Sequence, residues 1–234
     1  MASSTNATRL YRIMDFTRVV QIFEKGELYF ARPSTWDDPY EQRIKHAQDH
    51  AIFAQCWGRS PISDAMWRIY SQHGAGVRIS TTLNKLTDVM KATCKERNYL
   101  RRIKQVEYFS QKEIDEITKK IAQDLRESFD IGRAVDVLYM KREAFSHEAE
   151  WRAMFFTKKE SREKEEKGIS IKIDPHKFID RILLDPRAPD ELVRAFEFYF
   201  KEKLGFKGNV QRSSLYKIPE PYIIENNSND TGDL

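Results

Sequence analysis

Two glutamates one residue apart, Glu148 and Glu150, have the type and spacing that could do chemistry in this chain. They come just before residues 151–156, WRAMFF, which read as a β-strand. Side chains two residues apart in a strand point to the same face, so both carboxylates would lie side by side. Such a pair is either a solvated strand entrance or two carboxylates held at the edge of an active site. The spacing alone leaves both interpretations open.

The strand that follows the pair needs partners, and the first half of the sequence supplies them. Residues 27–33 (ELYFARP) and 76–82 (GVRISTT) read as strands. Residues 51–57 (AIFAQCW) form a nearly continuous apolar run, which is typical of a buried strand. Two short helices are also expected: one runs from an N-cap at Asp15 to a stop at Gly26, and another starts near Ser63.

The second half begins with an expected strand at 103–109, followed by a change to helical periodicity. Residues 111–144 therefore read as a helical insertion. The mixed-charge run 158–168 lies between two expected strands and reads as a long solvated hairpin loop. A later amphipathic helix is expected to have Asp190 as its N-cap and Gly205 as its stop.

These elements favour a single α+β domain over residues 9–222, with a mixed sheet, helices and the insertion at 111–144. A last strand is expected at 210–216. The ends of the sequence, 1–8 and 223–234, are small and polar, and they read as disordered tails.

The composition excludes several classes of protein. Of the 234 residues, 32% are charged and 40% are hydrophobic, and no stretch approaches the ~20 apolar residues of a membrane span. The N-terminus lacks the apolar core of a signal peptide, so we expect a cytoplasmic protein without membrane contact. The two cysteines, Cys56 and Cys94, suit a reducing compartment. The net charge of +4 permits a nucleic-acid partner without requiring one.

Other familiar chemistries lack their motifs. His46 and His50 are four residues apart, but no third metal ligand lies nearby in the sequence, so no metal site is expected. No glycine-rich phosphate loop of the Walker or Rossmann type occurs. Cys56 lies inside the apolar run, where an inert buried thiol is the better interpretation.

The four tryptophans fall beside turns or polar residues, and spacing does not decide their role. They are Trp36, Trp57, Trp67 and Trp151. Tryptophan is often a core residue, but a tryptophan with polar neighbours at a strand end can also stack on a flat ring.

Three blocks of the sequence occur in a recognisable order. They are LYRIMDFTRVVQIFEKGELYFARPSTWDDPYE, then CWGRSPISDAMWRIYSQHGAGVRI, then EAEWR. In this order they resemble an uncharacterised bacterial and phage family, domain of unknown function two-nine-seven-one, across residues 10–184. Trp36 and Asp37 stand where that family often has Phe and Asn. The family label names no reaction.

A second, more distant resemblance implies a reaction. Arg12 in LYR, Ser80 in RISTT and the E-x-E pair occur in the order found in ADP-ribosyltransferases of the Arg-Ser-Glu type. This resemblance implies a split mixed sheet and NAD as the substrate. It also implies roles for the two glutamates: Glu150 would stabilise the oxocarbenium-like ribose formed when nicotinamide leaves, and Glu148 would orient or deprotonate the acceptor.

The same resemblance implies a set of residues that bind NAD. Arg12 would pair with the pyrophosphate through its planar guanidinium, next to Tyr11. Ser80 would hold Glu150 or the ribose through a hydrogen bond. Trp67, Tyr70 or Trp151 would stack on nicotinamide or on an acceptor base.

The leading hypothesis is therefore an NAD-dependent mono-ADP-ribosyltransferase-like toxin or phage-defence effector. Its acceptor would be a macromolecule, either nucleic acid or protein, and an antitoxin or other regulatory partner is expected. One alternative is a non-enzymatic module of a phage or mobile element that binds a nucleotide or a protein. A second is a metal-dependent nuclease built on Asp37, Asp38, Glu41 and Glu150.

Overall fold

Strands and helices alternate irregularly along the computed structural model, which describes residues 8–61, 63–157 and 167–223. The strands are β1 (Arg9–Asp15), β2 (Glu27–Ala31), β3 (Ile52–Gly58), β4 (Gly76–Thr82), β5 (Leu100–Gln105), β6 (Glu107–Phe109), β7 (Met140–Arg142), β8 (Glu150–Phe156), β9 (Gly168–Lys172), β10 (Arg181–Leu184) and β11 (Asn209–Arg212). The helices are α1 (Phe16–Lys25), α2 (Asp64–Tyr70), α3 (Leu83–Arg97), α4 (Gln111–Glu127), α5 (Ile131–Val137), α6 (Pro175–Phe178) and α7 (Asp190–Phe198).

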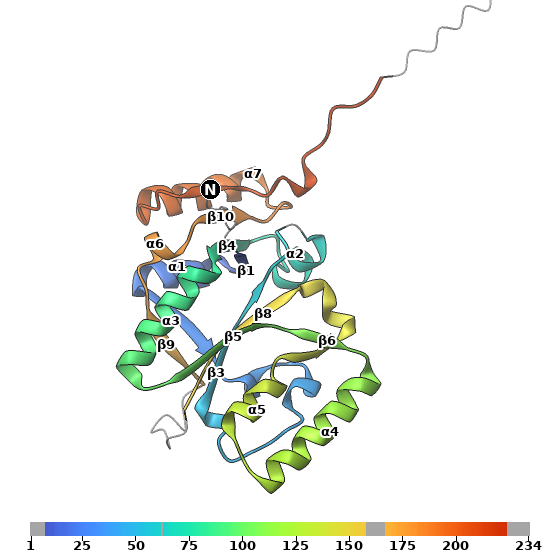
Figure 1. The fold of residues 1–234 in the computed structure, drawn as a ribbon. Helices are drawn as coiled ribbons and strands as arrows, with labels where there is room; N and C mark the ends of the chain where they lie inside the picture. Colours follow the sequence, from blue (N-terminus) through green and yellow to red (C-terminus); the bar gives the residue numbers. More distant parts are fainter. Residues whose placement is uncertain (1–7, 62, 158–166, 224–234) are drawn as a thin grey trace, which may run out of the picture.

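The main sheet, which has nine strands in the described ranges, divides at β3 (Figure 1). β8 pairs with β3 along the whole length of one edge. The other edge of β3 is shared, because β1 pairs with it at Gly58 and β2 pairs with it at Ala54. The sheet therefore has two arms, β1-β4-β10-β11 and β2-β9. This arrangement confirms the predicted α+β class with a split mixed sheet.

Both faces of β3 are buried, as its apolar run predicts. Phe53 and Trp57 belong to the main hydrophobic cluster, whereas Ile52 and Ala54 belong to a second cluster. Because side chains alternate along a strand, the two clusters lie on opposite faces of the sheet. The sequence pattern and the packing therefore agree at this strand.

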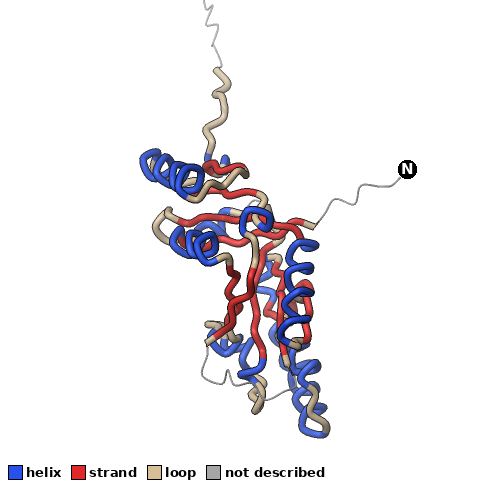
Figure 2. The backbone as a smooth tube through the Cα atoms, turned by 90° about the vertical axis from the view of Figure 1, so that its left-hand side faces the viewer, coloured by secondary structure: helices blue, strands red, loops and turns tan. Residues whose placement is uncertain are grey.

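Helices cover both faces of the sheet. The main cluster includes residues of α1, α3 and α7, and the second cluster includes residues of α5. A third cluster joins α4 to α5. The tube view shows helices on either side of the strands (Figure 2). Of these helices, α3 has no counterpart among the elements expected from the sequence.

The expected helical insertion is confirmed for α4 and α5, but its last residues are not helical. Residues 140–142 form β7, which pairs in parallel with β6 in a separate two-stranded sheet. The chain changes from helix to strand next to Tyr139, whose carbonyl oxygen accepts a hydrogen bond from the N–H of Glu107 at 2.8 Å. The single strand expected at 103–109 is accordingly two strands, because β5 pairs with β8 and β6 pairs with β7.

Most predicted helix ends are confirmed. Asp15 is the N-cap of α1, and Gly26 follows the helix with a φ of 61°. Ser63 is the N-cap of α2, and its hydroxyl accepts a hydrogen bond from the first turn. The start of α7 was predicted one residue late, because Pro189 is its N-cap and Asp190 is its first residue.

Two expectations for the second half need correction. The run 158–168 cannot close a hairpin of β8 with β9, because β9 pairs with β2 at the other arm; residues 158–166 themselves lie outside the described ranges. The last strand ends at Arg212, and residues 214–216 form a 3₁₀ turn instead. The expected tails fall mostly outside the described residues. Within the described ranges, no helix is long and apolar enough to span a bilayer.

Candidate active site

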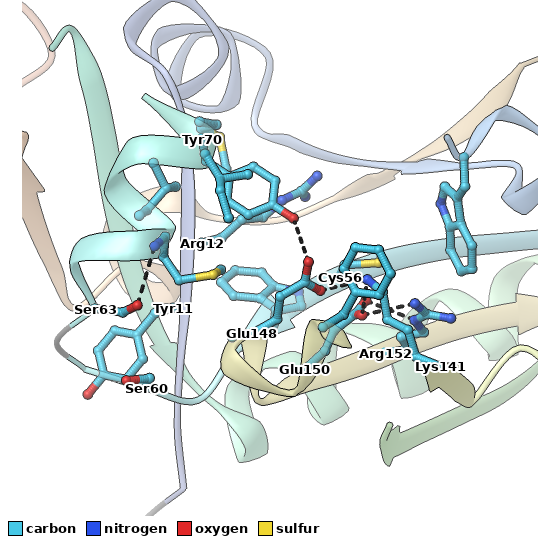
Figure 3. A pocket seen from close by; sticks show the side chains of 18 of the residues that line it. Tyr11, Arg12, Cys56, Ser60, Ser63, Tyr70, Lys141, Glu148, Glu150 and Arg152 are labelled. Atoms are coloured by element: carbon cyan, nitrogen blue, oxygen red, sulfur yellow. Dashed lines mark hydrogen bonds and ion pairs between the residues drawn. The ribbon is translucent and has the colours of Figure 1, made fainter. Parts of the chain in front are cut away.

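A cavity of about 510 Å³ opens where β1, β3 and the start of β8 come together (Figure 3). This volume lies within the ~300–1,000 Å³ typical of small-molecule sites. The residues that line it include Tyr11, Arg12, Trp36, Asp37, Asp38, Glu41, Cys56, Trp57, Trp67, Tyr70, Arg78, Lys141, Phe145, Glu148, Glu150 and Arg152. The first and third terms of the Arg-Ser-Glu set therefore share one cavity.

Arg12 is a cation of this cavity wall without a described partner. It lies on β1 opposite Ile79 of β4 and is half-buried. Burial lowers the pKa of its guanidinium. Within residues 8–61, 63–157 and 167–223, no carboxylate or carbonyl forms an ion pair or hydrogen bond with it. An arginine in this state can accept an anionic ligand through its planar fork.

Glu150 is held at both oxygens. Its Oε1 accepts from Arg152 Nε at 2.8 Å, and its Oε2 accepts from Arg152 Nη2 at 2.9 Å and from Lys141 Nζ at 3.3 Å. Only 4% of the residue is exposed. Burial favours the neutral carboxyl, but the two cations outweigh it and lower the pKa of Glu150 from 4.5 to about 2. Glu150 is therefore a fixed negative charge at neutral pH.

Glu148 is held at one oxygen and faces an aromatic hydroxyl at the other. Its Oε2 accepts from Lys141 Nζ at 2.6 Å, and the Tyr70 hydroxyl donates to its Oε1 at 3.5 Å (Figure 3). It ends a 3₁₀ turn, Glu143–Glu148, and Ala149 then takes a φ of 44° before β8 begins. Ala149, in the left-handed conformation between the two glutamates, determines how their side chains are oriented relative to each other.

The glutamates belong to a larger buried cluster of charges. Arg152 also donates to Glu41, and its guanidinium carbon lies 4.3 Å from the centre of the Trp36 ring. Burial raises the pKa of Glu41, although Arg152 acts in the opposite direction. With all carboxyl groups ionised, three glutamates face Lys141 and Arg152, which leaves one excess negative charge. The cavity thus combines a cluster of three glutamates and two cations with Arg12, which has no partner among the described residues.

Aromatic rings form another part of the wall. The Arg78 guanidinium lies 4.8 Å from the centre of the Tyr11 ring and 6.0 Å from that of Trp67. Trp67 is buried, whereas Tyr70 is 43% exposed at the mouth. Burial and the neighbouring Glu148 raise the pKa of Tyr70, so its hydroxyl stays protonated. Trp151, by contrast, is not among the lining residues and packs against the main cluster.

Ser80 does not join the other predicted residues. It lies on β4 opposite Tyr11, and it is absent from the cavity lining that the described residues form. Its hydroxyl donates to the carbonyl oxygen of Arg181 on β10 at 3.4 Å. The expected hydrogen bond to Glu150 is therefore replaced by one that ties two strands of the same arm together.

Three of the four acidic residues proposed for a nuclease, Asp38, Glu41 and Glu150, are engaged with cations. Asp38 accepts from Arg142 Nη2 at 3.0 Å and caps the following 3₁₀ turn. Glu41 and Glu150 share Arg152. Over the described parts of the chain, no group of three or more His, Cys, Asp or Glu side chains is placed so that it could hold a metal ion. This arrangement does not favour the nuclease alternative.

Three residues of the site were missed from the sequence: Lys141, Arg152 and Tyr108. Arg152 is two residues after Glu150 in a strand, so the alternation of faces could have identified it. Lys141 and Tyr108 lie in three-residue strands that pair only in the folded chain, and no local pattern marks them. The Tyr108 hydroxyl accepts from the backbone N–H of Glu150 at 2.9 Å.

Cys56 lines the cavity but is not a nucleophile. It lies opposite Arg152 in the β3–β8 ladder. Burial and the charge of Glu150 raise the pKa of its thiol far above the ordinary value. Because the thiolate is the reactive form, the prediction of an inert thiol agrees with this environment.

Residues 66–153 match the family model described as "Protein of unknown function (DUF2971)", which confirms the resemblance to that family. No curated protein sequence matches the chain significantly. Among solved structures, "Thermus sp. 2.9 DarT in complex with NAD+" has 8% sequence identity and a TM-score of 0.42, and the match covers 90% of this chain and 98% of that chain. "Thermus sp. 2.9 DarT in complex with ADP-ribosylated ssDNA" has 8% identity and a TM-score of 0.43, with 91% and 97% covered.

Proposed function

We propose that this protein transfers ADP-ribose from NAD to a macromolecular acceptor. The observation that carries the proposal is the shared cavity of Arg12 and the E-x-E glutamates, Glu148 and Glu150. These residues come from β1 and from the start of β8, and the order in which the chain supplies them is that of the Arg-Ser-Glu type. Their meeting in one cavity is what the transferase hypothesis requires.

The charges of the cavity suit two parts of NAD, the pyrophosphate and the nicotinamide ribose. The pyrophosphate is anionic, and Arg12 has no described partner that would compete for its guanidinium. The nicotinamide ribose becomes positively charged as the glycosidic bond breaks. The cations around Glu150 keep its carboxylate ionised, and a fixed negative charge stabilises the oxocarbenium-like state.

The two glutamates would divide the reaction between them. The bond between the ribose anomeric carbon and the nicotinamide nitrogen breaks, and nicotinamide leaves with the electron pair. An O–H or N–H group of the acceptor then forms the new bond to the anomeric carbon. Its proton passes to Glu148, whose Oε1 is held only by the long contact with Tyr70. Glu150 remains ionised throughout, because its pKa is about 2.

The aromatic wall would hold the flat rings. Tyr70 lies at the mouth, where an acceptor would enter, and Tyr11 lies beside Arg12 on β1. Aromatic side chains stack on nicotinamide or on a nucleobase equally well. The proposed acceptor is therefore nucleic acid or protein, and the proposed biological role is a toxin or phage-defence effector with a regulatory partner.

The test is incubation of the purified chain with NAD labelled on its adenylate part, together with cell RNA, DNA or protein. The wild type should label one of these acceptors, and Glu150→Gln should lower the rate by about 10²- to 10³-fold. Glu143→Gln is the matched control, because Glu143 is exposed in the same turn that ends at Glu148. It should retain the wild-type rate.

The outcomes separate the proposal from its main rival. No labelling and no release of nicotinamide by the wild type would overturn the transferase proposal. Binding of NAD that is unchanged in Glu150→Gln, with no turnover in either protein, would identify a nucleotide-binding module instead.

A further inference from the structure

Lys141 is the one side chain of the described site that contacts both glutamates of the E-x-E pair. Its Nζ lies 2.6 Å from Glu148 Oε2 and 3.3 Å from Glu150 Oε2. The residue is buried, and its ammonium lies 4.9 Å from the centre of the Phe145 ring. A single ammonium group therefore bridges the two carboxylates.

The fold fixes the position of Lys141 through the small sheet. Tyr108 of β6 and Lys141 of β7 lie opposite each other in the parallel pair. Tyr108 accepts the backbone N–H of Glu150, and Lys141 donates to the carboxylates. The two-stranded sheet thus holds the E-x-E segment (residues 148–150) at its backbone and at its side chains.

The glutamates could not keep this arrangement alone. Two buried carboxylates repel each other strongly when no cation lies between them. Arg152 holds Glu150 but forms no described contact with Glu148. Without Lys141, Glu148 would turn away from Glu150 and would lose its place beside the reacting ribose.

We propose that Lys141 is a positioning residue, which bridges the two carboxylates and orients Glu148 relative to Glu150 for its part in the reaction. This inference rests on the proposed function, because it assigns Glu148 its part in that reaction. Lys141 acts through the two carboxylates and supplies no atom to the products. The charge cluster also raises the pKa of Lys141, so the ammonium persists across the working range of pH.

The test compares Lys141→Met and Lys141→Arg with the wild type and with Lys172→Met. Lys172 is an exposed lysine of β9 and serves as the matched control. Lys141→Met should lower kcat by about 10- to 100-fold, the cost of misplacing a reacting group by an ångström or less, with little change in KM for NAD. Lys141→Arg should restore part of kcat, and Lys172→Met should match the wild type.

The comparison of kcat with KM distinguishes positioning from a general loss of structure. The charged and titratable groups around Glu148 are Lys141 of β7, Tyr108 of β6, Glu150 and Arg152 of β8, Tyr70 of α2 and Glu41. A fall in kcat with an equal rise in KM for NAD, and no rescue by Lys141→Arg, would indicate a structural role and overturn the proposal. Wild-type kcat in folded Lys141→Met would overturn it as well.

A second measurement does not depend on turnover. In carbon-detected NMR of the full chain at neutral pH, the Glu148 carboxyl resonance should move in Lys141→Met and stay in place in Lys172→Met; an unmoved resonance in both would overturn the proposal. If Lys141→Met does not fold, the wild type decides: the Lys141 ammonium protons should be protected from exchange with water by the two carboxylates, and rapid exchange would overturn the proposal. Absence of NAD turnover in the wild type would overturn the proposed function, while this NMR measurement would still report on Lys141.

Discussion

Arg152 holds Glu150 in a two-point ion pair, with Nε 2.8 Å from Oε1 and Nη2 2.9 Å from Oε2. The same guanidinium reaches Glu41 and the carbonyl oxygen of Leu138. The pair therefore joins β8 to the turn that contains Glu41 and to the end of α5. Its side chains are almost completely removed from water.

Loss of Arg152 should be costly for stability. Arg152→Met leaves two buried carboxylates without their main cation, and we expect the free energy of unfolding to fall by about 3–5 kcal/mol. Urea denaturation measures this change. Arg133→Met removes an exposed ion pair with Asp124 and should cost no more than ~1 kcal/mol. Equal losses in the two variants would contradict a structural role of the buried pair.

Acid should weaken the fold through Glu150. The unfolded chain takes up this proton near pH 4.5, whereas the folded chain takes it up only near pH 2, because the pKa of Glu150 is lowered to about 2. Between these values the unfolded state binds more protons, so stability falls as pH falls. The contribution lost is about 3 kcal/mol. Urea denaturation at pH 7, 4 and 2.5 should show that the free energy of unfolding falls less with decreasing pH in Glu150→Gln than in the wild type. Equal falls in both proteins would show that Glu150 does not cause this pH dependence.

Arg12 should contribute to NAD binding and little to folding. Arg12→Met removes the cation proposed for the pyrophosphate, and we expect a weaker affinity for NAD by about 10- to 100-fold, which corresponds to one charged hydrogen-bonding group. Calorimetric titration with NAD measures the affinity. Arg9→Met is the control, because Arg9 is exposed on the same strand. A melting temperature that falls sharply in Arg12→Met would instead indicate a structural role.

Cys56 should report on the charge of its neighbour. The negative charge of Glu150 helps to raise the pKa of the Cys56 thiol. Glu150→Gln removes that charge and leaves the cations Arg152 and Lys141, so more thiolate should form. In a Cys94→Ser background, iodoacetamide should alkylate Cys56 faster in Glu150→Gln than in the parent. Glu143→Gln should leave the rate unchanged, and an equal rise there would refute the link to Glu150.

The sequence predicts the site where local pattern suffices. Glu148 and Glu150 could be placed at a strand entrance because a strong strand pattern follows them, whereas Arg12 was identified through the order of residues in the Arg-Ser-Glu resemblance. Arg152 was also within reach, since alternation puts it on the face of Glu150. The positions of the two glutamates and of Arg152 follow from their neighbours in the sequence.

The remaining contacts depend on which strands meet. Ser80 bonds to Arg181 because β10 lies beside β4, and nothing near Ser80 in the sequence specifies that neighbour. The sequence predicts a helix at Lys141 because the apolar period of α5 leads directly into this residue. Its strand exists only because β6 offers a parallel partner more than thirty residues earlier in the chain. Long-range pairing of this kind leaves no local signal.

The two-stranded sheet has a consequence for how the site can be lost. β6 and β7 flank the helical insertion and share no strand pairing with the main sheet in the described chain. Folded domains open in separate cooperative units, each with its own free energy. Opening of the insertion alone would withdraw Tyr108 and Lys141 from the glutamates while the main hydrophobic cluster stayed intact. Assembly of the site therefore depends on the pairing of β6 with β7 as well as on the main sheet.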